Sequence, residues 1–313
     1  MGVVTGDGLV ASHASGLASV EHGVPASEST RFYVASLSKQ FTAACVLLAS
    51  DAGALDLGSR LSDWVPELPA WASRVEVTHL LAHSSGLPEY LELVQVSGRS
   101  QDDELSEELI LGLLSQVPVL TFAPGSQFVY CNTGYWLLGV VLHRATGTRL
   151  RAFADQHLFK PAGMLHSQYR DDRWEVLPGL ADGYAPRDGG GFRRWRTCFD
   201  QVGDGGVVTS LRDLARWESH LLRDDSEWCA LAARLAEPRP LVSGVVSDWR
   251  AGVLVGQHAG FPVVMAGGTG FGYRAFSVRV PSRGVGVIAL AGLVTADVKG
   301  AAFAVLDGMG PGA

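Results

Sequence analysis

The sequence predicts an α/β (α+β) fold in which an antiparallel sheet, built from both ends of the chain, is flanked by helices and carries an inserted, mostly helical lobe. Three observations predict it: β-type segments near the N-terminus, helical periodicity through the middle, and strand-like segments near the C-terminus. The chain has 313 residues, 47% of them hydrophobic, which is enough for one large core. We predict a single domain over 1–313, with an α/β lobe of about 1–60 plus 207–313 and a helical lobe of about 61–206.

The elements follow in order from the N-terminus. Short β-type segments broken by glycine fill residues 2–23, and a strongly apolar helix is expected from Ser36 to about Ala49. Three segments of the middle have helical periodicity or the composition of a buried helix, namely THLLAH, DDELSEELILGLLSQV and NTGYWLLGVVLHRATG. The segment SLRDLARWESHLL begins with Ser210 and Asp213 in capping-box spacing, which predicts a helix start.

The last part of the chain returns to strands. Four segments have this character, RAGVLVGQ, FPVVMAGG, YRAFSVRV and GVGVIALAG, and a closing helix is expected from about Ala296. Strands at both ends with helices between them place a cleft between sheet and lobe. Residues far apart in the sequence are expected to meet in that cleft.

Charge and composition exclude several classes of function. The net charge of −7 comes without any basic run, which argues against nucleic acid and membrane partners and favours a small-molecule or short peptide-like substrate. The N-terminus has no signal-peptide pattern and no long apolar stretch is present, so a cytoplasmic protein is expected. The four cysteines form no CxxC pair, which favours reduced thiols over a zinc site or a disulfide framework: Cys45, Cys131, Cys198 and Cys229. No feature of the sequence indicates the oligomeric state.

Ser36 and Lys39 form the first candidate catalytic pair. They lie three positions apart at the expected start of a helix, on the same face. A serine hydroxyl needs a base to become a nucleophile, and a lysine amine serves as one when burial and a helix dipole lower its pKa. Only three of the 25 Lys and Arg residues are lysines, which hints at a need for an amine, although a GC-rich genome gives the same bias. Alone, the pattern is equally compatible with a serine N-cap.

Tyr130 and Asn132 form the second candidate group, just before a buried helix. A phenol beside a lysine can relay a proton, and an asparagine amide can hold a substrate carbonyl or the lysine. The alternative is a loop tyrosine followed by an asparagine N-cap. Between them, Cys131 fits as a small hydrophobe or as a thiol open to labelling near a lysine.

The segment MAGGTGFGYRA, residues 265–275, is the third candidate. It contains four glycines within strand-like sequence. A glycine inside a strand usually marks a bulge or the close approach of another group. The family resemblance described next implies that the approaching group is an acyl carbonyl attached to Ser36.

Taken in order, these three motifs resemble those of the serine β-lactamase and penicillin-binding-protein superfamily, most of all its class C β-lactamase-like and esterase branch. Six blocks across nearly the whole chain carry the resemblance: GLASVEHGVPASESTRFYVASLSKQFTA, VTHLLAHSSGLPEY, FAPGSQFVYCNTGYWLLG, FADQHLFKPAGM, GDGGVVTSLRDLARW and GGTGFGYRA. The resemblance implies a β-lactamase/transpeptidase-like fold and catalysis through an acyl-enzyme without a cofactor. It assigns Ser36 as the nucleophile, Lys39 as its proton acceptor and Tyr130 as the group that helps to protonate the leaving group.

The same resemblance assigns substrate-binding positions. Asn132 matches the substrate-positioning amide, and the backbone N–H groups of Ser36 and Thr269 match the oxyanion hole. Gly267 and Gly268 belong to the third motif, whose usual Lys or His is replaced here by Ala266. A cation there would attract a substrate carboxylate, so its absence favours substrates that need not carry one. Arg274 is a candidate for supplying the charge instead, against the alternative of a solvated strand arginine.

Several functions remain open at this level. The first hypothesis is a serine hydrolase that acts on an ester or amide, and the alternatives are a biosynthetic acyltransferase or cyclase, a β-lactamase or D-amino-acid peptidase, and a non-catalytic binding pseudoenzyme. His79 and His83 have metal-ligand spacing but no accompanying carboxylates, so a metal is not expected. The stretch Asp204-Gly205-Gly206 is expected either to shape the cleft rim or to form a turn before the next helix.

Overall fold

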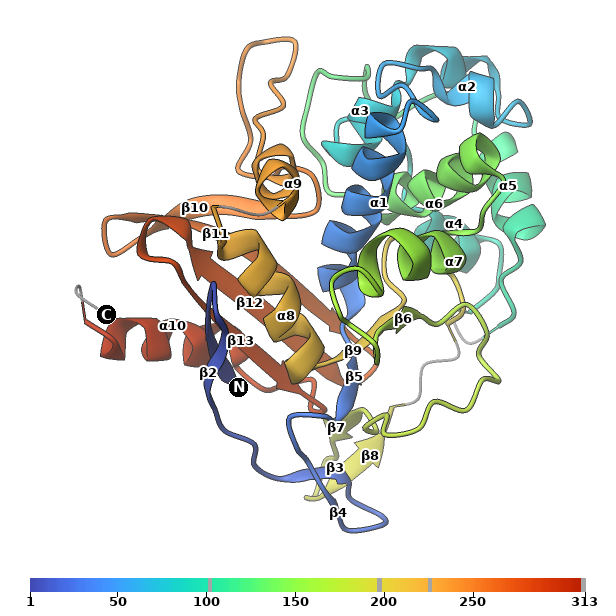
Figure 1. Ribbon diagram of the computed structural model, residues 1–313. Coiled ribbons are helices and arrows are strands. Elements are labelled where there is room, and N and C mark those ends of the chain that lie inside the picture. Colours follow the sequence, from blue (N-terminus) through green and yellow to red (C-terminus); the bar gives the residue numbers. More distant parts are fainter. Residues whose placement is uncertain (101–102, 196–198, 225–226, 311–313) are drawn as a thin grey trace.

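The computed structural model describes residues 1–100, 103–195, 199–224 and 227–310. Its main sheet has six strands in the order β10-β11-β12-β13-β1-β2, all antiparallel to their neighbours. The strands are β1 (Gly2–Thr5), β2 (Gly8–Ser12), β10 (Leu254–His258), β11 (Phe261–Gly270), β12 (Tyr273–Val280) and β13 (Val285–Ala291). Strand β1 pairs with β13 from Gly2↔Ile288 to Thr5↔Val285. The predicted sheet from both termini is therefore confirmed (Figure 1).

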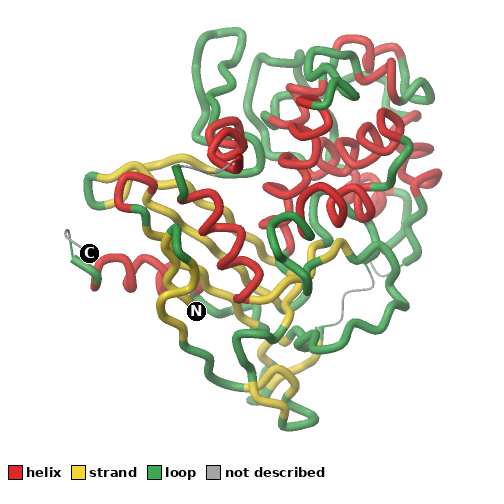
Figure 2. Tube along the Cα trace, in the orientation of Figure 1, coloured by secondary structure: helices red, strands yellow, loops and turns green. Residues whose placement is uncertain are grey.

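Helices cover both faces of this sheet. Helix α10 (Val298–Gly308) packs on β12 and β13, and α8 (Leu211–Leu222) packs on the opposite face against β1, β2 and β13 (Figures 1 and 2). The predicted start of α8 is confirmed, because Ser210 caps it by accepting a hydrogen bond from the Asp213 amide at 3.2 Å. Within the described residues, no helix combines the length and the apolar composition needed to cross a bilayer.

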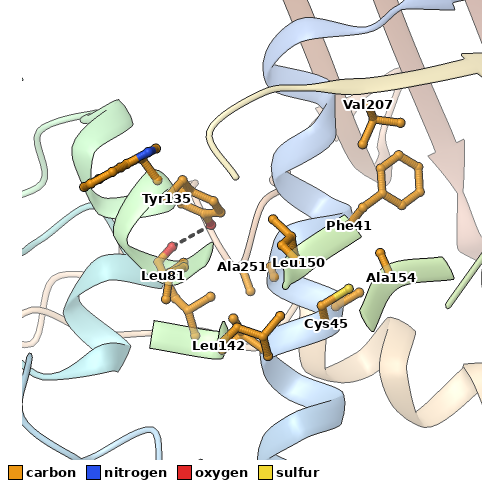
Figure 3. Packing of buried hydrophobic residues seen from close by; sticks show 14 of the residues in the cluster. Phe41, Cys45, Leu81, Tyr135, Leu142, Leu150, Ala154, Val207 and Ala251 are labelled. Atoms are coloured by element: carbon orange, nitrogen blue, oxygen red, sulfur yellow. Dashed lines mark hydrogen bonds between the residues drawn. The ribbon is translucent and has the colours of Figure 1, made fainter. Parts of the chain in front are cut away.

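The helical part of the molecule is assembled around α1 (Lys39–Asp51). It packs against α6 (Asn132–Thr146), α7 (Leu150–Ala154) and α9 (Glu227–Leu235). Figure 3 shows Phe41 and Cys45 of α1 among Leu142, Leu150 and other apolar side chains. The remaining helices are α2 (Leu61–Trp64), α3 (Val77–Leu81), α4 (Tyr90–Val96) and α5 (Glu107–Ser115), with single turns η1 (Ala35–Ser38), η2 (Ala70–Arg74), η3 (Asp155–Phe159) and η4 (Pro281–Arg283).

A small three-stranded sheet joins these two parts. Its order is β5-β9-β6, formed by β5 (Arg31–Tyr33), β9 (Val207–Ser210) and β6 (Gln168–Tyr169). Strand β5 leads directly into η1, and β9 follows the stretch Asp204-Gly205-Gly206. Their pairing, from Arg31↔Ser210 to Tyr33↔Val208, thus brings two segments far apart in the chain to the same place. Two hairpins complete the fold: β3 (Leu17–Ser19) with β4 (Val24–Pro25), and β7 (Tyr184–Pro186) with β8 (Phe192–Arg194).

Candidate active site

Ser36 lies in the tight turn η1 between strand β5 and helix α1. Its neighbours Val34 and Leu37 are fully buried, whereas Ser36 itself is partly accessible. Ala35 has a φ of 46°, in the left-handed region that a residue with a side chain rarely adopts. The buried flanks hold this strained turn in place, so that a single serine hydroxyl is presented at the surface of the core.

Lys39, the first residue of α1, is fully buried and faces Ser36. Its Nζ lies 3.2 Å from Ser36 Oγ and 2.8 Å from Asn132 Oδ1, and it also donates to the main-chain carbonyl of Asp204. These three acceptors match the three N–H groups of an ammonium. In the neutral amine, Asn132 and the Asp204 carbonyl can retain two N–H groups, which leaves the lone pair for Ser36.

Tyr130 completes the constellation from the other side of the serine. Its hydroxyl donates to Ser36 Oγ at 2.9 Å, and its ring centre lies 5.0 Å from Lys39 Nζ. The ring is 42% exposed, so it forms part of the accessible wall of the site. The structure thus brings together Ser36, Lys39, Tyr130 and Asn132, which come from two separate segments of the chain.

The Tyr130 ring is held from behind by two residues. The His83 ring centre lies 4.4 Å from it, and Trp249 meets its edge at 5.6 Å. His83 Nδ1 accepts a hydrogen bond from the Cys131 amide at 3.1 Å, and burial, with the nearby Lys39 charge, holds the pKa of His83 well below its usual value. His83 is therefore a neutral packing residue, and His79 Nδ1 likewise accepts from the Glu76 amide at 3.0 Å. Trp249 lies in a loop and carried no signal in the sequence.

Gly268 of the third motif lies against the turn that carries Ser36. A Cβ atom added to Gly268 would lie 2.0 Å from the Val34 carbonyl oxygen and 3.0 Å from the Ser36 amide nitrogen. The group that lies close to Gly268 is thus protein backbone, and the acyl carbonyl expected along this strand stays a prediction. The contact sets Thr269 of β11 beside the turn that carries Ser36.

Ala266 and Arg274 lie on opposite faces of the sheet. Ala266 pairs with Ser277 and Thr269 pairs with Arg274, and alternation along β11 places Ala266 and Thr269 side chains on different faces. Ala266 is 5% exposed, and Arg274 Nε donates to the Val294 carbonyl at 2.6 Å. The structure therefore does not bring the Arg274 guanidinium to the face of the sheet where the usual cation is missing.

Two carboxyl groups to which the sequence analysis gave no catalytic role interact with Lys39, a buried one on Asp204 and a half-buried one on Glu89. Asp204 Oδ2 accepts from the Tyr90 hydroxyl at 3.1 Å, and burial raises the pKa of Asp204 to about 6. Glu89 Oε2 accepts from the Asn132 amide at 2.7 Å, and burial also raises the pKa of Glu89. Asp204 is 6% exposed and its main-chain carbonyl contacts Lys39, so it lies in the core and not at the cleft rim.

Cys131 behaves as a small hydrophobe. It is 4% exposed, its Sγ lies 3.5 Å from the Leu87 carbonyl oxygen, and burial raises its pKa to about 11. A thiol of this kind is a poor nucleophile at neutral pH. The alternative of a readily labelled thiol beside the lysine is therefore not supported.

Comparison with known proteins gives consistent matches. Residues 1–308 match the family model described as Beta-lactamase. A D-aminopeptidase of Cereibacter sphaeroides is 28% identical over 275 residues, which cover 88% of this chain and 52% of that protein. The penicillin-binding protein 4* of Bacillus subtilis is 27% identical over 287 residues, which cover 88% of this chain and 63% of that protein.

Among solved structures, the octameric penicillin-binding protein homologue from Pyrococcus abyssi superimposes with a TM-score of 0.85 at 23% identity, covering 98% of this chain and 72% of that one. This likeness concerns the fold. The chain spans about half the length of the D-aminopeptidase it matches and less than two thirds of the Bacillus subtilis protein.

Proposed function

The chain belongs to the beta-lactamase family of serine hydrolases, and from this premise we propose that it forms an acyl-enzyme on Ser36 with an ester or amide substrate that need not carry a carboxylate. The family match confirms the resemblance read from the three sequence motifs. The observation that carries the proposal is the position of Ser36 Oγ, which lies 3.2 Å from Lys39 Nζ and 2.9 Å from the Tyr130 hydroxyl. A nucleophile within reach of a base and a proton relay is the arrangement that acyl transfer requires.

In the first half-reaction, the neutral Lys39 amine takes the Ser36 proton while Oγ bonds to the substrate carbonyl carbon. The negative oxygen of the tetrahedral intermediate faces the backbone N–H groups of Ser36 and Thr269, a type of contact worth about a hundred- to a thousand-fold in rate per donor. Tyr130 gives its proton to the departing oxygen or nitrogen as that bond breaks, and Lys39 returns a proton to Tyr130. Water then repeats the sequence on the acyl-enzyme and releases the acid.

The preference for uncharged substrates rests on the surroundings of the site. Ala266 offers no charge for a carboxylate, and Arg274 is directed to the other face of the sheet. Next to Tyr130, Phe128 is 38% exposed and Val129 is 50% exposed. Exposed apolar side chains directly before Tyr130 in the sequence favour an apolar substituent on the substrate.

The test of the nucleophile is labelling with a fluorophosphonate, read as a mass increase of the intact protein. We expect one equivalent of probe on the wild-type chain, located at Ser36 by peptide mapping, and no addition to Ser36→Ala. A control esterase confirms that the probe is active. If the wild-type chain and Ser36→Ala stay equally unlabelled, a non-catalytic binding protein becomes the better interpretation.

A second candidate, D-amino-acid peptide hydrolysis, is favoured by the names of the D-aminopeptidase and penicillin-binding-protein relatives. A panel of p-nitrophenyl esters of neutral acids, D-amino-acid p-nitroanilides and a chromogenic cephalosporin separates the candidates. We expect the neutral esters to be turned over fastest and the carboxylate-bearing cephalosporin weakly or not at all. Efficient cephalosporin hydrolysis would contradict the role assigned to Ala266.

A further experiment distinguishes hydrolysis from acyl transfer, which shares the first half-reaction. Amines or alcohols are added to the reaction, and the products are identified by mass.

A further inference from the structure

Asp204 interacts with Lys39 in two ways, through its main-chain carbonyl and through its side-chain carboxyl group. The Asp204 carbonyl oxygen accepts a hydrogen bond from Lys39 Nζ. Its carboxyl group is buried, with Oδ2 bonded to the Tyr90 hydroxyl and Oδ1 without a hydrogen-bond partner among the described residues. An unpartnered carboxylate oxygen in the core is costly unless a charge nearby compensates for it. Lys39 is the cation that interacts with it.

The charges around Lys39 do not balance one to one. Asp204 and the half-buried Glu89 both interact electrostatically with this single buried lysine, so a charged Lys39 with two ionised carboxyl groups would leave a net negative charge at the edge of the core. Burial raises the pKa of both carboxyl groups, which favours a proton on one of them. The protonation of Lys39 and that of Asp204 are therefore coupled.

We propose that Asp204 is a positioning residue for Lys39. The main-chain carbonyl of Asp204 holds the Lys39 amine toward Ser36. The buried Asp204 carboxyl group, held by Tyr90, sets how readily Lys39 releases its proton. This inference rests on the proposed function, in which Lys39 acts as the base. An ionised Asp204 holds the ammonium in its charged form, and a protonated Asp204 lets Lys39 become the neutral amine that acylation needs. The acid thus determines the pH at which the nucleophile becomes active.

Other titratable groups near this pair come from several elements. Glu89 precedes α4, Tyr90 begins α4, Tyr33 lies on β5, and Tyr169 on β6 interacts electrostatically with Asp204. Burial raises the pKa of each of these tyrosines, so all three stay neutral over the working range. His83, near Lys39, is neutral as well. Among the groups just named, Asp204 and Glu89 are the carboxyl groups whose charge is coupled to that of Lys39.

The test uses the small number of lysines in the chain. Lys39, Lys160 and Lys299 are its only lysines, so [13Cε]-lysine labelling yields three NMR signals, of which the Lys39 signal is the one absent from Lys39→Arg. We expect Asp204→Asn, which keeps the main-chain carbonyl, to move the titration midpoint of the Lys39 signal to lower pH by about one unit or more. The pH at which fluorophosphonate labelling of Ser36 reaches half its maximum should move in the same direction.

Two further variants keep the test decisive. Tyr90→Phe removes the hydrogen bond that favours the ionised carboxylate, so it should shift the Lys39 midpoint in the same direction by a smaller amount, even if Asp204→Asn does not fold. Asp213→Asn removes a fully buried carboxylate bonded to Ser167 and Arg216, and should leave the midpoint unchanged. An unchanged midpoint in folded Asp204→Asn, or in Tyr90→Phe, would overturn the inference. The NMR result does not depend on acylation, so a failure of labelling alone counts only against the proposed function.

Discussion

Replacing Lys39 with alanine is expected to lower the rate of Ser36 acylation by about three orders of magnitude or more, because residues that act as one catalytic unit show large effects when one is removed. Among the described residues, the Lys39 amine is the basic group that lies within hydrogen-bond distance of Ser36 Oγ, at 3.2 Å. The measurement is the second-order rate of fluorophosphonate labelling, together with kcat/KM for a neutral p-nitrophenyl ester. A loss smaller than about ten-fold would remove Lys39 from the role of base.

The matched control for this prediction is Lys160→Ala. Lys160 is a surface lysine, 66% exposed, that pairs with Asp155 at 2.6 Å. Exposed ion pairs contribute about 0–1 kcal/mol, so both the labelling rate and the melting temperature should stay close to those of the wild type.

Tyr130→Phe gives the second comparison, because it removes the hydroxyl group and keeps the ring against His83 and Trp249. It should also lose several orders of magnitude in turnover while the protein remains folded.

The sheet and the catalytic core of the site were predictable because local sequence carries them. Strand-like segments at both ends of the chain predicted the sheet, and Ser210 with Asp213 predicted the start of α8. The spacing of Ser36 and Lys39 places the two side chains on one face of any helical turn, whatever the rest of the fold. The structure brings these two residues within hydrogen-bond distance.

The supporting residues were not predictable in the same way, because their roles depend on tertiary contacts. Asp204 lies 165 positions from Lys39, and its burial follows from the pairing of β5 with β9. Trp249 comes from a loop whose sequence has no pattern that directs it toward Tyr130. The facing of Arg274 depends on strand register, and a shift of one residue would reverse it. Contacts of this kind, between residues far apart in the sequence, form only when separate segments pack together.

Gly268→Ala is expected to disturb the molecule more than Gly267→Ala, the same change at its neighbour in the third motif. The added Cβ would lie 2.0 Å from the Val34 carbonyl oxygen and 2.8 Å from the Leu37 amide nitrogen, so main chain must move. Gly268 is not among the residues with positive φ, so backbone strain at the alanine itself is not the cause. Overpacking of this kind costs about 1–3 kcal/mol, and a displacement of the nucleophile by about 1 Å can cost about a hundred-fold in rate.

Gly267→Ala is the control that isolates the contact with the nucleophile turn. The nearest atom to its added Cβ is Phe276 Cδ2 at 3.3 Å, which belongs to a side chain that can shift by a few tenths of an ångström. We expect Gly267→Ala to keep the wild-type melting temperature and labelling rate within about twofold, whereas Gly268→Ala loses both. If Gly268→Ala labels as fast as Gly267→Ala, the strand does not set the position of the Ser36 turn. A rate loss in Gly268→Ala at full thermal stability would instead show that the glycine serves the geometry of the nucleophile more than the stability of the fold.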